Sequence, residues 1–174
     1  MIPKKPLGAA RNNGKKSETI VQEALELLER QYPSTFVRLY DSTSAGLGSG
    51  GNYIPAQPGD FIYVLDSTAI IIMLLEVKSS KVHLSLTETT LRNVFSDNQI
   101  SGSRRWLRAG ALSLCVFHSI PGGCMEIWDM QDINRAYLAP PRQRKLTAKP
   151  LATFRANYAV LADELKSIVK WRTK

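Results

Sequence analysis

The stretch PGDFIYVLDSTAIIIMLLEVKSS, residues 58–80, decides the fold because it joins an apolar hairpin to a charged end. Residues 61–65 predict one strand, residues 66–68 are typical of a turn, and residues 69–78 predict a second strand. The second strand is apolar on both faces over residues 70–75, as expected of a strand that is covered on both sides. The hairpin is therefore expected near the centre of an α/β sheet.

Three charged side chains are expected at one end of this hairpin. Side chains alternate along a strand, so Glu76 and Lys78 share one face and Val77 points to the other. If the hairpin folds back on itself, Asp60 returns to the same end. Two carboxylates and a lysine suit phosphodiester hydrolysis. The carboxylates hold a hard divalent cation that lowers the pKa of bound water, and the lysine orients that water or neutralises charge on the phosphate.

The alternative for the same residues is a surface ion pair at a strand end, because Glu-x-Lys is a common combination in any globular domain. The position of Asp60, directly after Pro-Gly and ahead of an apolar hairpin, favours the functional interpretation. A buried acid and base are costly unless they are paired or bound to a metal.

The motif Pro58-Gly59-Asp60 followed by Glu76-Val77-Lys78 resembles the signature of the PD-(D/E)XK nucleases, the restriction-endonuclease-like superfamily. Within that superfamily the pattern is most similar to Holliday-junction resolvases. The segment Gly14-Lys15-Lys16-Ser17-Glu18 resembles their basic start before a helix with a metal-binding glutamate. Gln99, Gly110 and an apolar strand follow in the resolvase order. Gly59, inserted inside the motif, and the lack of a His before Gln99 are departures.

The resemblance implies an α/β fold: a restriction-endonuclease-like central mixed β-sheet flanked by helices, with a C-terminal helix. The metal ligands that it implies are Glu18, Asp60, Glu76 and the backbone carbonyl of Val77, with Mg²⁺ or Mn²⁺ as the metal. It implies that Lys78 positions the attacking water or stabilises the charge of the transition state. It also implies that Gln99 lies beside the scissile phosphate. The implied activity is endonucleolytic cleavage of DNA at four-way junctions by a homodimer, since symmetric incision needs two active sites.

Two of these residues have simpler explanations that stay open. Glu18 follows Ser17, a candidate cap for a helix that Pro33 stops, and an acid in a first turn stabilises the helix dipole. Ser96 and Gln99 form a capping-box pattern, so Gln99 can serve as a cap for a helix that closes at Gly110.

Rival functions are also open. One is a related nuclease that acts on duplexes, nicks, flaps or single strands. The other is a non-enzymatic nucleic-acid-binding module on a nuclease-like fold, against which the complete Asp, Glu and Lys set argues.

The charge balance points to a polyanionic partner. The 174 residues include 23 Lys and Arg against 15 Asp and Glu, giving +8 and a pI near 9.7, although solubility alone also explains a basic protein. The candidate DNA-binding residues are Lys15, Lys16, Lys81, Arg104, Arg105 and Arg108. Trp106 and Leu107 are expected to pack inward. The sequence has no apolar signal core or membrane-length run, so we expect a cytoplasmic protein.

The expected organisation is a mobile basic arm (1–16), a nuclease core (17–138), and a basic linker with a C-terminal helix (139–174). A Gly/Ser-rich segment at 41–52 is expected to be a loop that accommodates the substrate. Other expected elements are a strand at 36–40, helices at 87–95 and 96–108, and a hairpin of 112–117 with 124–128. The last helix has an apolar stripe, from Phe154 to Ile168, that suits core packing or a dimer seam. His118 is expected to be a strand-end residue, and Cys115 and Cys124 to be reduced core residues.

Overall fold

The structure is a computed structural model of the chain, and it describes residues 11–39, 59–66 and 70–172. The first ten residues of the expected basic arm, the Gly/Ser-rich segment at 41–52 and Pro58 lie outside the described residues.

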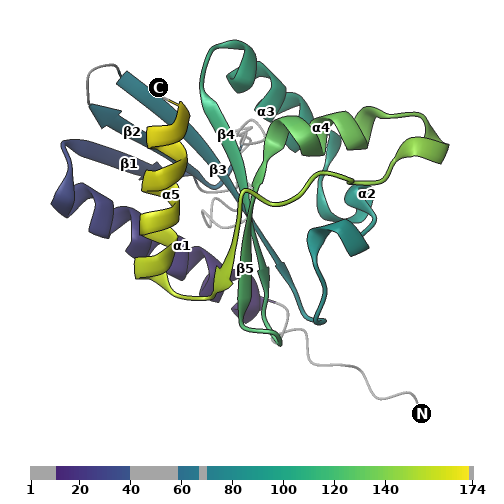
Figure 1. Cartoon of the computed structure of the whole chain (residues 1–174), viewed down its shortest axis with the longest axis horizontal. Coiled ribbons are helices and arrows are strands. Elements are labelled where there is room, and N and C mark those ends of the chain that lie inside the picture. The colour runs from purple at the N-terminus through teal and green to yellow at the C-terminus, as the bar shows by residue number, and fades with distance from the viewer. Residues whose placement is uncertain (1–10, 40–58, 67–69, 173–174) are drawn as a thin grey trace, which may run out of the picture.

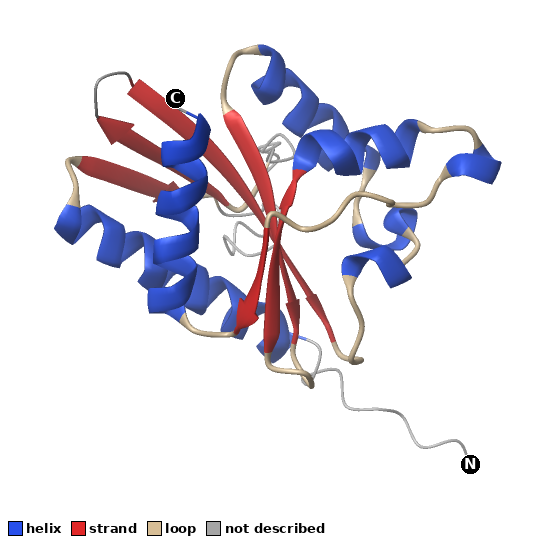
Figure 2. Ribbon diagram, in the orientation of Figure 1, coloured by secondary structure: helices blue, strands red, loops and turns tan. Residues whose placement is uncertain are grey.

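The described residues form one six-stranded mixed sheet with helices on both faces (Figures 1 and 2). The strand order is β1-β2-β3-β4-β5-β6, and β3 and β4 are parallel while the other neighbouring pairs are antiparallel. The helices and strands are α1 (Arg11–Gln31), β1 (Ser34–Arg38), β2 (Phe61–Asp66), β3 (Ile70–Ser80), α2 (Leu91–Val94), α3 (Asp97–Arg108), β4 (Leu112–Ser119), β5 (Cys124–Asp129), α4 (Met130–Leu138), β6 (Ala152–Arg155) and α5 (Tyr158–Arg172), with 3-10 turns at Leu86–Glu88 and Pro141–Gln143. The prediction of an α/β fold with a central mixed sheet, flanking helices and a C-terminal helix is confirmed.

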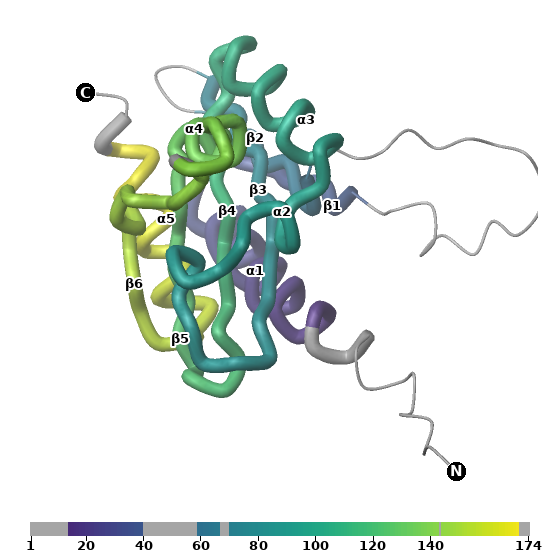
Figure 3. The backbone as a smooth tube through the Cα atoms, turned by 90° about the vertical axis from the view of Figure 1, so that its right-hand side faces the viewer, coloured from purple at the N-terminus to yellow at the C-terminus, as the bar shows by residue number. Residues whose placement is uncertain are grey.

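Two apolar cores hold the helices to the sheet. Helices α1 and α5 pack on one face, where Leu25, Phe61 and Leu165 are fully buried. Helices α2, α3 and α4 pack on the other face around Phe117 and Trp128. Figure 1 shows these two layers on opposite sides of the strands, and Figure 3, turned by 90°, looks onto the layer of α2, α3 and α4. The parallel pair β3–β4 is possible because α2 and α3 connect the two strands across one face.

The predicted hairpin is confirmed, but one expectation about it is wrong. β2 pairs antiparallel with β3, with Phe61 opposite Leu75. However, Ile70 is 72% exposed and Ile72 is 36% exposed, so the first half of β3 is not covered on both faces. Val37 of β1 shares that face and is 57% exposed. The reason is that the core of α2–α4 reaches β4 and β5 and does not extend over β1 and β2.

The start of the first helix also differs from the prediction. Helix α1 begins at Arg11, so residues 11–16 are helical, and Ser17 is an interior residue instead of the N-cap. Ser17 is buried and shares a 2.8 Å hydrogen bond with Nδ1 of His118 on β4. A small polar side chain suits this close contact between helix and strand. His118 itself lies at the end of β4, as predicted, and is buried there.

Later elements were partly missed. The helix expected over 87–95 is split into the turn Leu86–Glu88 and α2, and α4 and β6 were not predicted. Phe154 lies in β6 instead of the last helix, which begins at Tyr158. Leu161, Leu165 and Ile168 are buried, which confirms core packing for that stripe. The two cysteines are unpaired, Cys115 in the core and Cys124 half-buried. No helix in the described part of the chain is long and apolar enough to cross a membrane.

Candidate active site

The hairpin brings Asp60 against the Glu76-Val77 end of β3. The backbone N–H of Asp60 donates to the Leu75 carbonyl at 2.8 Å, and the N–H of Val77 donates to Oδ2 of Asp60 at 2.6 Å. The N–H and C=O of one strand residue point to the same neighbour in an antiparallel pair. The Val77 carbonyl therefore points, like its N–H, toward Asp60 and past the start of β2. This predicted juxtaposition of Asp60 with Glu76 and Val77 is confirmed.

Gly59, the departure from the motif, has a steric explanation. A Cβ added there would lie 2.9 Å from the Leu75 carbonyl oxygen and 3.0 Å from the Leu74 side chain. Both distances are shorter than ordinary contacts, and a backbone oxygen cannot move aside easily. Glycine at this position lets the chain run close along β3 and places the Asp60 carboxylate beside Val77.

Glu76 is a buried carboxylate with one oxygen unused. Its side chain faces the α3 side of the sheet, and the residue is 4% exposed. Its Oε1 accepts from Lys78 Nζ at 2.7 Å and from the Gln99 amide, whereas its Oε2 is buried with no hydrogen-bond partner among the described residues. Burial raises the pKa of Glu76 to about 7; the Asp60 charge adds to the rise, and Lys78 and Gln99 oppose it. An unsatisfied buried carboxylate oxygen needs a cation or a proton.

Lys78 and Gln99 complete the cluster. Lys78 Nζ lies 3.2 Å from Gln99 Oε1 and 5.5 Å from the ring centroid of Phe95. Gln99 also makes the predicted capping box, because its Oε1 accepts from the Ser96 N–H at 3.1 Å and its N–H donates to Ser96 Oγ. The two interpretations of Gln99 thus do not exclude each other. The cap fixes the side chain, and the fixed side chain reaches both Glu76 and Lys78.

The structure pairs Glu18 with an arginine of the first strand. Glu18 is ion-paired with Arg38 on β1, and the Arg38 guanidinium stacks over Phe61, the residue after Asp60. Within the described ranges, no three His, Cys, Asp or Glu side chains are close enough together to hold a metal ion. Two of the three predicted carboxylates are thus brought together. Sequence analysis missed Arg38, although its place at the end of a strand that pairs with β2 would have signalled it.

The residues present nevertheless fit a hard divalent cation. The donors available are the Asp60 carboxylate, the unpartnered Oε2 of Glu76 and the Val77 carbonyl, and Mg²⁺ and Mn²⁺ take oxygen ligands of this kind. The raised pKa of Glu76 supports the same view, because the nearby Asp60 carboxylate is one of its causes. A cation would relieve the repulsion between the two acids.

The predicted DNA-binding residues are all at the surface. Exposed side chains are those of Lys15 and Lys16 on α1, Lys81 after β3, and Arg104, Arg105 and Arg108 on α3. Leu107 packs against the core of α2–α4 as predicted, but Trp106 is half-buried and belongs to neither apolar core. Trp106 follows Gln99 by seven residues, nearly two helical turns, so both lie on the same flank of α3.

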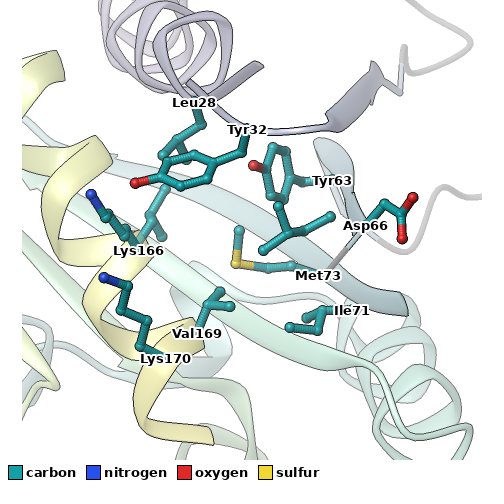
Figure 4. A pocket seen from close by; sticks show the side chains of 11 residues that line it. Leu28, Tyr32, Tyr63, Asp66, Ile71, Met73, Lys166, Val169 and Lys170 are labelled. Atoms are coloured by element: carbon teal, nitrogen blue, oxygen red, sulfur yellow. The ribbon is translucent and has the colours of Figure 1, made fainter. Parts of the chain in front are cut away.

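An apolar pocket of about 230 Å³ lies away from this cluster, on the α1 and α5 face of the sheet. Figure 4 shows Lys166, Val169 and Lys170 of α5 beside Tyr32 and Met73. The side chains of Glu76 and Lys78 point to the opposite face, so this pocket is not part of the candidate active site.

No family model matches the sequence, and no curated protein matches it. Among solved structures, the chain is similar to the 1.6 Å structure of Hjc, a Holliday junction resolvase from the archaeal hyperthermophile Archaeoglobus fulgidus. The identity is 15%, the match covers 83% of this chain and 97% of that chain, and the TM-score is 0.41. A likeness of this size does not establish a shared activity. The class of site rests on the chain's own geometry: two carboxylates, a lysine and a glutamine at the end of a hairpin in an α/β fold.

Proposed function

We propose that this chain is a metal-dependent endonuclease of the PD-(D/E)XK class, which hydrolyses phosphodiester bonds in DNA at four-way junctions and acts as a homodimer. The observation that carries the proposal is the buried Glu76, whose Oε2 has no partner among the described residues while Asp60 and Lys78 lie beside it. A structural ion pair between Glu76 and Lys78 would not require the second carboxylate.

In this proposal Asp60, Glu76 and the Val77 carbonyl hold Mg²⁺ or Mn²⁺. The cation, when bound, polarises the phosphate and acidifies a water. Glu76 must give up its proton to serve as a ligand, and its raised pKa of about 7 means that part of this carboxyl is protonated near neutral pH until a metal binds. Lys78, held by Glu76 Oε1 and Gln99 Oε1, supplies the positive charge that orients the water or offsets charge on the phosphate.

Glu18 enters the proposal as a third ligand that Arg38 holds aside. Arg38 sits on β1 at the register of Phe61, next to Asp60, where a DNA phosphate would approach the site. A guanidinium binds phosphate as well as it binds a carboxylate, so an incoming phosphate competes with Glu18 for Arg38. Loss of the ion pair with Arg38 would favour binding of the Glu18 carboxylate to the metal.

DNA as the substrate is supported by the net charge of +8 and by the exposed basic residues on α1 and α3. The preference for a junction, and the homodimer that symmetric incision requires, come from the resemblance to resolvases. A nuclease that cuts duplex, flap or single-stranded DNA remains the alternative for the same catalytic cluster.

The test is cleavage of a labelled four-way junction and of a matched linear duplex, each with Mg²⁺, with Ca²⁺ and with excess chelator. We expect junction cleavage in Mg²⁺ only, because Ca²⁺ accepts looser coordination and acidifies water poorly. Cleavage in chelator would remove the metal mechanism. Equal cleavage of both substrates would favour the alternative, a nuclease without a preference for junctions.

A further inference from the structure

We propose that the groove between α3 and α4 binds a backbone phosphate of a DNA segment other than the one that is cut. The groove has a volume of about 600 Å³, and its polar lining comes from Arg104 and Arg108 of α3 with Gln131, Asn134 and Arg135 of α4. This inference rests on the proposed function for its ligand, because DNA is the polyanion that the catalytic cluster would act on.

The charge of the groove favours an anion. Three of its lining residues are arginines and none of them is Asp or Glu. Asp132, which does not line the groove, accepts from Arg135 through its Oδ1 at 3.1 Å in an ion pair that is accessible to solvent. Arginines that face each other from two helices match the spread of oxygens on a phosphate, since each guanidinium can make two parallel hydrogen bonds.

A buried amide lies beside these arginines. Asn134 is 95% buried, and its Oδ1 accepts from Ser103 Oγ on α3 at 3.1 Å. This buried contact ties α4 to α3 beside the groove, so the arginines that the two helices contribute are held near one another.

The groove is on the wrong side of α3 to hold the scissile phosphate. At 3.6 residues per turn, Gln99 and Arg104 lie about 140° apart around the helix, and Arg108 is about 13 Å further along the axis than Gln99. Gln99 contacts Glu76 and Lys78, whereas Arg104 and Arg108 face α4. A phosphate in the groove therefore belongs to DNA that passes α3 on its other flank.

The chain contains a control for this idea. Arg155 on β6 is exposed and carries the same charge, but it does not line the groove. Loss of general surface charge would affect DNA binding in Arg155→Ala as much as in Arg135→Ala. A phosphate site in the groove predicts a difference between them.

The experiment measures affinity for a four-way junction against salt concentration, in chelator so that no cleavage occurs. The variants are Arg104→Ala/Arg108→Ala, Arg135→Ala and Arg155→Ala. We expect the double variant to reduce the slope of log affinity against log salt by about 1.8 and Arg135→Ala to reduce it by about 0.9, because about 0.9 is lost per phosphate contact. Arg155→Ala is expected to keep the wild-type slope.

A second readout uses the side-chain amide of Asn134. A short DNA duplex titrated into isotopically labelled protein should shift the Asn134 Nδ2 resonances in the wild type and much less in Arg104→Ala/Arg108→Ala. Inorganic phosphate should cause the same shift only at far higher concentration, which separates a free anion site from a DNA backbone site.

Unchanged slopes in the groove variants would overturn the proposal and favour an acidic partner protein as the occupant of the groove. Equal slope losses in Arg135→Ala and in Arg155→Ala would overturn it in favour of diffuse surface charge. The outcome is separable from that of the proposed function, because binding in chelator does not depend on cleavage. If the protein binds DNA through the groove but cleaves no substrate in Mg²⁺, the proposed endonuclease activity is refuted and the proposed phosphate site in the groove stands.

Discussion

At the scale of single residues, the defining feature of the site is a buried carboxylate, Glu76, whose pKa is raised. Burial and the Asp60 charge raise its pKa, and Lys78 and Gln99 compensate only one of its two oxygens. The sequence alone predicted that Asp60, Glu76 and Lys78 lie close together. Side-chain alternation along a strand and the antiparallel pairing of a hairpin both follow from local sequence. The sequence did not predict the Arg38–Glu18 pair, which depends on contacts between separate elements.

Glu76→Gln should stabilise the protein above neutral pH. The pKa of Glu76 is raised from 4.5 to about 7 in the folded state, so the wild type loses stability as the pH rises from 4.5 to 7. The variant lacks this loss. The difference should be on the order of 3 kcal/mol at pH 8 and vanish at pH 4, since one pKa unit is about 1.36 kcal/mol. Urea unfolding at both pH values measures it, and Mn²⁺ should recover the wild type and not the variant. Parallel pH profiles for the two proteins would contradict this account.

Arg38→Ala should tighten the binding of Mn²⁺, because it removes the positive charge that now pairs with the Glu18 carboxylate. Calorimetric titration of Mn²⁺ into the apoprotein measures the effect. The double variant Arg38→Ala/Glu18→Gln is the control and should lose the gain. Identical affinities for the wild type and Arg38→Ala would exclude Glu18 as a third ligand.

At the scale of elements, local signals were enough for the β2–β3 hairpin, the β4–β5 hairpin and α3 with its capping box. The missed elements lack such signals. Helix α4 starts directly at the end of β5, where Asp129 caps it without an intervening turn, and β6 is only four residues long and depends on pairing with β5. The first helix was predicted to begin too late, because serine is a typical N-cap residue. In the structure α1 begins at Arg11, so Ser17 is an interior residue, and its side chain contacts His118.

Gln99 offers a test of how α3 serves the site. Gln99→Ala should lower cleavage strongly, because it removes the partner shared by Glu76 and Lys78. Ser96→Ala removes the Ser96 Oγ that caps the Gln99 N–H but keeps the Ser96 backbone N–H that holds Gln99 Oε1, so it should cost about 1 kcal/mol of stability with little change in kcat. Thermal unfolding and single-turnover cleavage of the two variants separate the roles. Equal losses of activity in both would mean that Gln99 is only a cap.

At the scale of the whole molecule, the two helix layers leave exposed part of the sheet face that carries Glu76 and Lys78. The exposed Val37, Ile70 and Ile72 lie on the same face as Glu76 and Lys78, on the side of β3 away from the core of α2–α4. Sequence reasoning could not find this face, because an apolar run does not show how far a helix layer extends over its sheet.

A homodimer with two equivalent sites should nick a four-way junction twice, at positions related by two-fold symmetry. Sedimentation of the free protein and of its junction complex measures the stoichiometry, and mapping of the labelled strands locates the nicks. We expect two chains per junction and paired nicks. A strictly monomeric protein that makes one nick would contradict the resolvase and favour a nuclease that acts on duplex, flap or single-stranded DNA.

The central claim is that Asp60 and Glu76 form a metal site that cleaves DNA, and the most direct measurement is the single-turnover cleavage rate of Asp60→Asn in Mg²⁺. Its matched control is Asp66→Asn, which makes the same change at the exposed far end of β2. Asp60→Asn should lose at least about 100-fold in rate, close to 3 kcal/mol of transition-state stabilisation, with DNA affinity unchanged or tighter, because one ligand charge near the phosphate is gone. Asp66→Asn should cleave like the wild type. Cleavage by Asp60→Asn at near wild-type rate would contradict the account.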